Sequence, residues 1–147
     1  MDVPHFKQEY EWTCGPAVMK MVLAHCKIKK SEKSLAKLMK TNKKHGTDHR
    51  QFPSIAEKYK LTYLIGRKDS TIKELKEAIK DGYKIIICYY LKKKGDGHYA
   101  VIKSIENGKI NLTDPGYGPG HKFSVKYFKK IWFGNQTHKG WYIGIKK

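Results

Sequence analysis

The stretch QEYEWTCGPA, residues 8–17, runs directly into the apolar segment VMKMVLA, residues 18–24. It is typical of a loop that carries a cysteine to the start of a buried helix. Gly15 allows the chain to turn tightly from the loop into the helix. Pro16 suits the first helical turn, where its missing N–H is not needed. Because apolar residues surround most of the following segment, we expect a central helix rather than a surface one.

Cys14 lies where this helix is expected to begin. A helix N-terminus carries unpaired N–H groups and a partial positive charge, which favour a thiolate over a thiol. The same residue could instead be a small buried hydrophobe, the usual fate of a free cysteine. The local sequence leaves both interpretations open, so the choice depends on what the rest of the chain supplies.

Length and cysteine content restrict the class of protein. A chain of 147 residues fits one domain, residues 1–147, with a core of its own. No apolar run is long enough to span a bilayer, and the N-terminus lacks the features of a signal peptide. Cys14, Cys26 and Cys88 are too few, and odd in number, for a disulfide framework. We therefore expect a reducing, cytoplasmic location.

The net charge is +18, from 31 Lys+Arg against 13 Asp+Glu. Such a charge attracts nucleic acid, anionic membrane or acidic peptides. However, the basic residues are spread along the chain and nearly all are lysine, whereas base and phosphate recognition favours arginine. No nucleic-acid-binding motif is visible. We therefore regard nucleic-acid binding as a weaker interpretation of the charge than a generally lysine-rich surface. The sequence leaves the oligomeric state open.

The first half of the chain predicts helices. Ser31 or Ser34 can cap a short helix that buries Leu35, Leu38 and Met39. The next helix starts near Gln51 or Phe52 with Pro53 in its first turn, and residues 61–65 read as a strand. Another helix follows Thr71, where Thr71 and Glu74 have the spacing of a capping box and Gly82 is placed to end it.

The second half predicts a sheet. Residues 85–91 form a continuous β-prone run, long enough for a central strand, and a turn follows at residues 92–97. Residues 98–105 and 109–113 form a hairpin, residues 114–120 an irregular loop, and residues 141–145 a last strand. A short helix capped by Ser124 precedes that strand. Helices followed by a mostly antiparallel sheet indicate an α+β fold whose two halves pack together.

A cysteine nucleophile needs a base, a group that orients the base, and donors for the oxyanion. Of the seven histidines, His98 opens a strand at a sheet edge, where a cleft can form. His25 lies within the first helix, away from its N-terminus. The remaining five occupy polar or loop contexts and are most simply solvated; these are His5, His45, His49, His121 and His138.

Asp114 is the natural orienting residue, and Asp96 is its rival. A two-residue Asn107-Gly108 turn would set Asp114 opposite Val101, on the wrong face for His98. A three-residue loop that includes Glu106 sets it opposite Ala100, on the face of His98 at a diagonal spacing of roughly 7–8 Å. The triad therefore predicts a bulged hairpin. Gln8 can donate its amide N–H to an oxyanion beside the backbone N–H of Cys14.

The ordered set Gln8, Cys-Gly-Pro-Ala at 14–17, Gly46-Thr47, Gly-His-Tyr-Ala-Val at 97–101 and Asp-Pro-Gly at 114–116 resembles one known family. It is similar to the papain-like cysteine peptidases that process bacteriocin precursors after a double-glycine leader. The resemblance covers nearly the whole chain. It implies a papain-like fold with an N-terminal helical lobe packed on a C-terminal antiparallel sheet, and a peptide or protein substrate.

The resemblance also assigns roles. It implies that Cys14 is the nucleophile, His98 the general base and acid, Asp114 the orienting residue and Gln8 the oxyanion donor. The family often has aspartate just before its cysteine, where this chain has Thr13. No transmembrane or ATPase part follows, so we expect a stand-alone domain. Whether a transporter is needed stays open.

Double-glycine specificity requires a narrow passage beside the nucleophile. Trp12, Tyr117 and Trp132 could form its walls, and Trp12, Gly97 and Tyr117 are candidate substrate-binding residues. No cofactor is expected. A metal site from His45, His49 or Cys26 lacks the usual pairing of zinc ligands. The open alternatives are another acyl transferase on the same fold, transpeptidase-like or transglutaminase-like, and a non-catalytic peptide-binding module.

Overall fold

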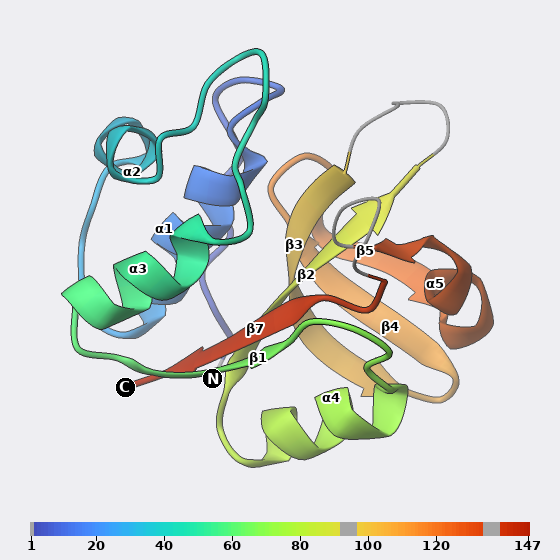
Figure 1. The fold of residues 1–147 in the computed structure, drawn as a ribbon. Helices are drawn as coiled ribbons and strands as arrows, with labels where there is room; N and C mark the ends of the chain where they lie inside the picture. The colour runs from blue at the N-terminus through green and yellow to red at the C-terminus, as the bar shows by residue number, and fades with distance from the viewer. Residues whose placement is uncertain (1, 92–96, 134–138) are drawn as a thin grey trace.

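The computed structural model describes residues 2–91, 97–133 and 139–147 (Figure 1). The helices in these ranges are α1 (Cys14–His25), α2 (Glu32–Leu38), α3 (Gln51–Lys58), α4 (Ile72–Lys80) and α5 (Val125–Ile131). The strands are β1 (Thr62–Gly66), β2 (Lys84–Tyr90), β3 (Gly97–Glu106), β4 (Lys109–Asp114), β5 (Gly118–Ser124), β6 (Trp132–Phe133) and β7 (Tyr142–Lys146). The turn expected at residues 92–97 falls mostly outside the described residues.

The strands form one sheet in the order β1-β7-β2-β3-β4-β5, with β6 also paired to β2. Each of the described strand pairs is antiparallel. Together with the helices, this confirms the α+β prediction. No helix among the described residues is long and apolar enough to cross a membrane.

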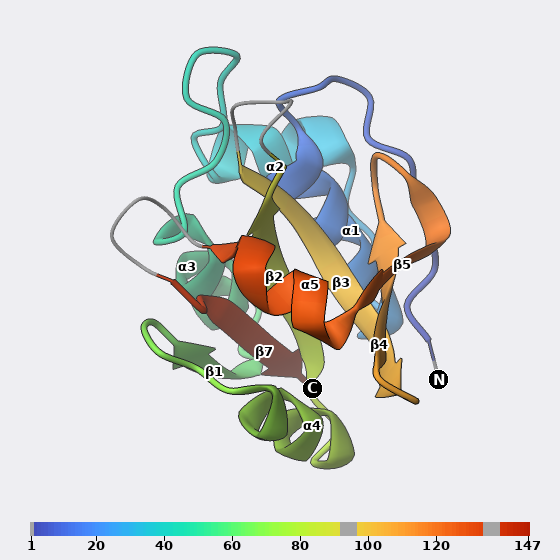
Figure 2. The ribbon, with the colours of Figure 1, turned by 90° about the vertical axis from the view of Figure 1, so that its right-hand side faces the viewer.

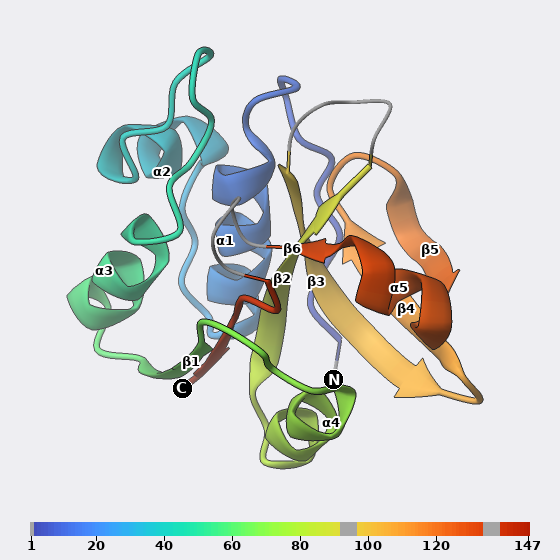
Figure 3. The same cartoon turned by 45° about the vertical axis from the view of Figure 1, so that its right-hand side comes forward.

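Both faces of the sheet are covered. Helices α1, α2 and α3 lie on one side, and α5 lies on the other (Figures 1 and 3). Along β2, Ile86 and Cys88 pack into the core under α1 to α3, whereas Ile85, Ile87 and Tyr89 pack into a second core with residues of α4 and α5. This two-sided burial explains the continuous apolar run of β2, which has no polar face to present to solvent.

Most helix boundaries follow their local signals. The side chains of Ser31, Thr71 and Ser124 each accept a hydrogen bond from the N–H three residues on. Gly82 adopts a φ of 92° just after α4, a conformation that glycine adopts without strain. The expected burial of Leu38 is wrong, because 41% of its surface is exposed. Helix α2 turns Leu35 toward the core instead.

The hairpin between β3 and β4 differs from the prediction in an instructive way. Glu106 pairs with Lys109, so Asn107-Gly108 is a two-residue turn, and its φ values of 53° and 72° are those of a type I′ turn. The predicted three-residue loop is therefore wrong. The register shifts instead between Ile102 and Ser104, which places Thr113 opposite Val101. This bulge has the same effect on Asp114 as the longer loop would have had.

Strand β5 was not expected. The sequence favours an irregular loop over residues 114–120, but β5 begins at Gly118 and pairs with β4 along the edge of the sheet (Figure 2). Its start, Gly-Pro-Gly, has low strand propensity. Because β5 is an edge strand, Pro119 is tolerated there without breaking a central ladder.

Candidate active site

Cys14 is the first residue of α1 and only 8% of its surface is exposed. The preceding loop is closed by Thr13, whose hydroxyl donates to the carbonyl of Tyr10 and accepts from its N–H. A Cβ at Gly15 would collide with the side chain of Thr47. Glycine at this position therefore lets the loop that carries Thr47 lie against the start of the helix.

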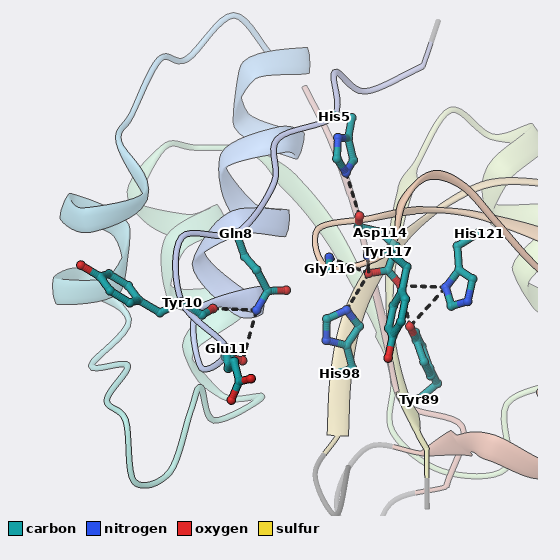
Figure 4. Close-up of polar contacts among 10 residues, drawn as sticks. All are labelled: His5, Gln8, Tyr10, Glu11, Tyr89, His98, Asp114, Gly116, Tyr117 and His121. Atoms are coloured by element: carbon teal, nitrogen blue, oxygen red, sulfur yellow. Dashed lines mark hydrogen bonds and ion pairs between the residues drawn. The ribbon is translucent and has the colours of Figure 1, made fainter. Parts of the chain in front are cut away.

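His98 and Asp114 meet at the other side of the site (Figure 4). His98 is the second residue of β3, and its Nε2 lies 2.6 Å from Oδ1 of Asp114, the last residue of β4. The aspartate has no exposed surface, and the imidazole is 11% exposed. Since Nε2 is bound to Asp114, Nδ1 is the ring nitrogen left to serve Cys14.

The electrostatics favour an ion pair between these two side chains. Burial lowers the pKa of His98, but hydrogen bonds to Asp114 and Cys14 and the charges of both outweigh burial and raise the pKa to about 10. Burial raises the pKa of Asp114, yet the hydrogen bond and charge of His98 and the hydroxyl of Tyr89 hold it well below its usual range. At neutral pH the pair is therefore an imidazolium and a carboxylate.

Gln8 lies at the site with its amide turned in an unexpected direction. Its Nε2 donates to the carbonyls of Tyr10 and Glu11, at 2.7 and 3.1 Å, and its backbone N–H donates to the carbonyl of Pro115. Its Oε1 is buried without a hydrogen-bond partner among the described residues. An oxyanion-donor role would require the amide to release one of the two carbonyls, and that role stays a prediction.

The candidate substrate-binding residues occupy different settings. Trp12 stacks on the largely exposed ring of Tyr10, with centroids 5.4 Å apart. Tyr117 is 45% exposed and meets the ring of His98 edge-on at 5.9 Å. Gly97 is exposed and directly precedes His98 on β3. Trp132 does not line the passage predicted beside Cys14, because it is buried in the core on the α5 side of the sheet.

Comparison with protein families agrees with this geometry. The model of the Peptidase C39 family matches residues 2–136. The chain belongs to the Peptidase C39 family. This confirms the resemblance drawn from the sequence, and it makes the chain a member of a cysteine peptidase family. A search of curated proteins finds no match to the chain.

Solved structures confirm the C39 peptidase fold. The peptidase domain of Streptococcus ComA, a bifunctional ABC transporter involved in a quorum-sensing pathway, is 25% identical, with a TM-score of 0.77 over 96% of both chains. A C39-like peptidase from Bacillus anthracis is 15% identical, with a TM-score of 0.78 over 99% of this chain and 94% of that one. A double-glycine motif protease from an AMS/PCAT transporter, solved with its leader peptide, is 20% identical, with a TM-score of 0.73 over 99% and 91%.

Three histidines expected to be solvated are bound in this C39 domain. Nε2 of His5 lies 2.7 Å from the carbonyl oxygen of Asp114, and Nδ1 of His121 lies 3.1 Å from the Asp114 carboxylate. His49 stacks on Trp141 and bonds the hydroxyl of Tyr99. The contacts of His5 and His49 depend on distant segments, and that of His121 depends on the pairing of β5 with β4, so the sequence carried no signal for them. His45 is exposed, as expected, and His138 and Asp96 lie outside the described residues.

Glu32 is a buried acidic residue next to the site that the sequence analysis did not single out. It is 3% exposed, and its carboxylate accepts a hydrogen bond from the N–H of Glu9 at 2.9 Å. Burial raises its pKa. Glu32 therefore anchors the loop that carries Gln8 to the start of α2. Among the described residues, no group of three or more His, Cys, Asp or Glu could hold a metal ion.

Gly116 sits where His98 and Gln8 approach each other. A Cβ there would lie 3.1 Å from Cε1 of His98 and 3.2 Å from Oε1 of Gln8, so one of them would have to move. We expect Gly116→Ala to lower kcat/KM by about tenfold or more, since small displacements of reacting groups are costly. Steady-state kinetics on the purified variant measures this change.

Gly120→Ala is the matched control for Gly116→Ala, because a Cβ at Gly120 would meet nothing within 4 Å. It should retain wild-type kinetics. Equal losses in the two variants would mean that the loop, rather than the contact with His98 and Gln8, accounts for the effect.

Proposed function

We propose that residues 1–147 form a single peptidase domain that cleaves a peptide bond after a small-residue site such as Gly-Gly. The observation that carries the proposal is the position of His98, which is bonded to Asp114 through Nε2 and interacts with the side chain of Cys14. A cysteine, a protonated histidine and a buried carboxylate are the groups that thiol-dependent acyl transfer requires.

In the proposed reaction the thiolate of Cys14 attacks the carbonyl carbon of the scissile bond, and a carbon–sulfur bond forms. The carbon–nitrogen bond then breaks, and His98 gives its proton to the leaving amine. In the second half, His98 takes a proton from water while the water oxygen attacks the thioester. The carbon–sulfur bond breaks and the carboxylic acid leaves, with Cys14 and His98 returned to their starting ionisation.

The preference for a small residue is supported by the crowding beside His98. Tyr117 meets the imidazole edge-on, and a Cβ at Gly116 would press against both His98 and Gln8. We infer that this crowding favours a substrate whose residues beside His98 are small. The complex of the double-glycine motif protease with its leader peptide supports a peptide substrate for this fold.

The test is cleavage of matched peptides that carry Gly-Gly, Ala-Ala or Leu-Leu before one scissile bond, followed by mass spectrometry. We expect Gly-Gly to be cut fastest and Leu-Leu slowest. Cleavage of Leu-Leu as fast as Gly-Gly would contradict the specificity. Adding an amine or a thiol to the reaction separates hydrolysis from transfer, because a transferase would give the conjugate in place of the free acid.

The pH dependence follows from His98. Its pKa of about 10 lies above its ordinary value, so the proton needed by the leaving amine is present at neutral pH and is lost as the pH rises through about 10. We therefore expect the basic limb of the kcat/KM profile near pH 10. A basic limb near the pKa of an ordinary histidine would contradict the ion pair with Asp114.

We also propose that the protein works in a reducing compartment, the cytoplasm. Cys14, Cys26 and Cys88 are buried, and they form no disulfide with one another. Oxidation of Cys14 would remove the thiolate on which the proposed reaction depends.

A further inference from the structure

The second oxygen of the Asp114 carboxylate is bound by two side chains that the proposed reaction does not use. Oδ1 accepts from His98 and from the N–H groups of Gly116 and Tyr117, at 2.8 and 3.1 Å. Oδ2 accepts the hydroxyl of Tyr89 at 2.5 Å and lies 3.1 Å from Nδ1 of His121 (Figure 4). Because Asp114 has no exposed surface, these protein groups take the place of water around its charge.

Tyr89 contacts both members of the His98–Asp114 pair. It lies on β2 directly opposite His98 on β3, and its ring meets the imidazole at 5.3 Å with an interplanar angle of 72°. Its side chain has no exposed surface. Burial and the charge of Asp114 raise the pKa of Tyr89 well above its usual range, so the hydroxyl stays a neutral donor.

His121 reaches the carboxylate from β5, the strand that the sequence did not predict. Its ring stacks on Tyr117 at 4.6 Å, and Tyr117 in turn meets His98 edge-on. The contacts therefore close a ring from Asp114 through His121 and Tyr117 to His98. The imidazole of His121 is 21% exposed, whereas Tyr89 approaches from the buried side.

We propose that Tyr89 and His121 are positioning residues that hold the Asp114 carboxylate in place and share its negative charge, so that His98 can release its proton. This inference rests on the proposed peptidase function. Hydrogen bonds to Oδ2 stabilise the carboxylate most when the neighbouring imidazole is neutral, because the charge is then uncompensated. Loss of a donor at Oδ2 therefore makes His98 hold its proton more tightly.

Other ionisable groups surround the pair and stay the same in the test. Cys14 faces His98 from α1, and Nε2 of His5 reaches the backbone carbonyl of Asp114, away from the carboxylate. Tyr117 contacts His98 through its ring. Among these groups and the described residues around them, Tyr89 and His121 are the side chains bonded to Oδ2.

The first test is Tyr89→Phe, which removes the hydroxyl and keeps the ring. We expect kcat to fall by about 10- to 100-fold, the usual effect of losing a hydrogen bond to a charged group. KM should stay unchanged because Tyr89 cannot touch substrate, and the basic limb of the pH profile should move to higher pH. In an Asp114→Ala background, Tyr89→Phe should change kcat by less than about twofold.

A second pair of variants covers the possibility that Tyr89→Phe fails to fold. His121→Leu removes the donor, whereas His121→Asn keeps an N–H near the position of Nδ1. We expect the leucine variant to lose activity and the asparagine variant to recover most of it. Equal activity of the two variants would overturn the role of His121.

A readout that needs no turnover separates this inference from the proposed function. The titration of the His98 imidazole in the free protein can be followed by NMR in wild type and Tyr89→Phe. A shift to higher pH in the variant supports charge sharing, and an unchanged or lower midpoint overturns it. If the wild-type protein cleaves no peptide, the proposed function fails while this titration still decides the inference.

Discussion

Replacing Cys14 by alanine is expected to lower kcat/KM by at least about 10⁴-fold, the order seen when a covalent nucleophile is removed. The thiolate is the atom that bonds the substrate in the proposed reaction, and Ala offers no replacement. The fold should survive, because the change removes one sulfur from a single buried residue at the start of α1 and leaves the rest of that core in place. Initial rates with a Gly-Gly peptide measure the loss.

Cys26→Ala is the matched control. Cys26 caps the far end of the same helix and is 4% exposed, so its loss perturbs packing similarly without touching the site. We expect this variant to keep wild-type rates, and we expect both variants to show cooperative thermal unfolding. Undiminished cleavage by Cys14→Ala would show that another group carries the chemistry.

Asp114→Asn should lower kcat by about 10²- to 10⁴-fold while KM changes little, as expected when the group that orients a catalytic histidine loses its charge. The amide has one accepting oxygen where the carboxylate has two, and it removes the negative charge that raises the pKa of His98. The basic limb of the kcat/KM profile should therefore move to lower pH, opposite to its expected shift in Tyr89→Phe.

Asp81→Asn is the control for this substitution, since Asp81 is exposed at the end of α4 and its backbone carbonyl, which the change keeps, accepts a hydrogen bond from Nζ of Lys146. It should leave both kcat and the pH profile unchanged. An Asp114→Asn variant that folds and keeps the wild-type basic limb would remove Asp114 from the orienting role.

The sequence predicted the elements better than the contacts between them. Pro16, Ser31, Thr71 and Gly82 act locally, within a turn of the helix they begin or end, so the boundaries could be read from neighbouring residues. The apolar run of β2 likewise indicated a central strand. Local chemistry decides these features, and the structure reproduces them.

Register was harder to predict, because two different backbones give the same alignment. A three-residue loop and a two-residue turn followed by a bulge both place Asp114 on the face of His98. The requirement that the side chains of His98 and Asp114 meet predicted how β3 and β4 align. It did not predict whether the extra residue lies in the turn or in a strand. The bulge near Lys103 has no sequence marker, since any residue can occupy it.

The contacts around Asp114 could not be read from the sequence for a related reason. His121 looks like a histidine in a glycine-rich loop until β5 pairs with β4, and Tyr89 looks like an ordinary strand tyrosine until β2 pairs with β3. Both reach one carboxylate only through sheet topology. For Leu38 the sequence predicted a buried contact that the structure lacks. An apolar residue on a short helix need not face the core.

The central claim, that Cys14 is the reactive thiol of a peptide-binding site, is tested most directly by covalent labelling. The protein is treated with a Gly-Gly peptide that ends in a thiol-reactive electrophile, digested, and mapped by mass spectrometry. We expect one adduct, at Cys14, with Cys26 and Cys88 unmodified, and no adduct when competing peptide is in excess. Labelling of Cys26 or Cys88 at the same rate, or labelling of Cys14 that competing peptide does not slow, would contradict it.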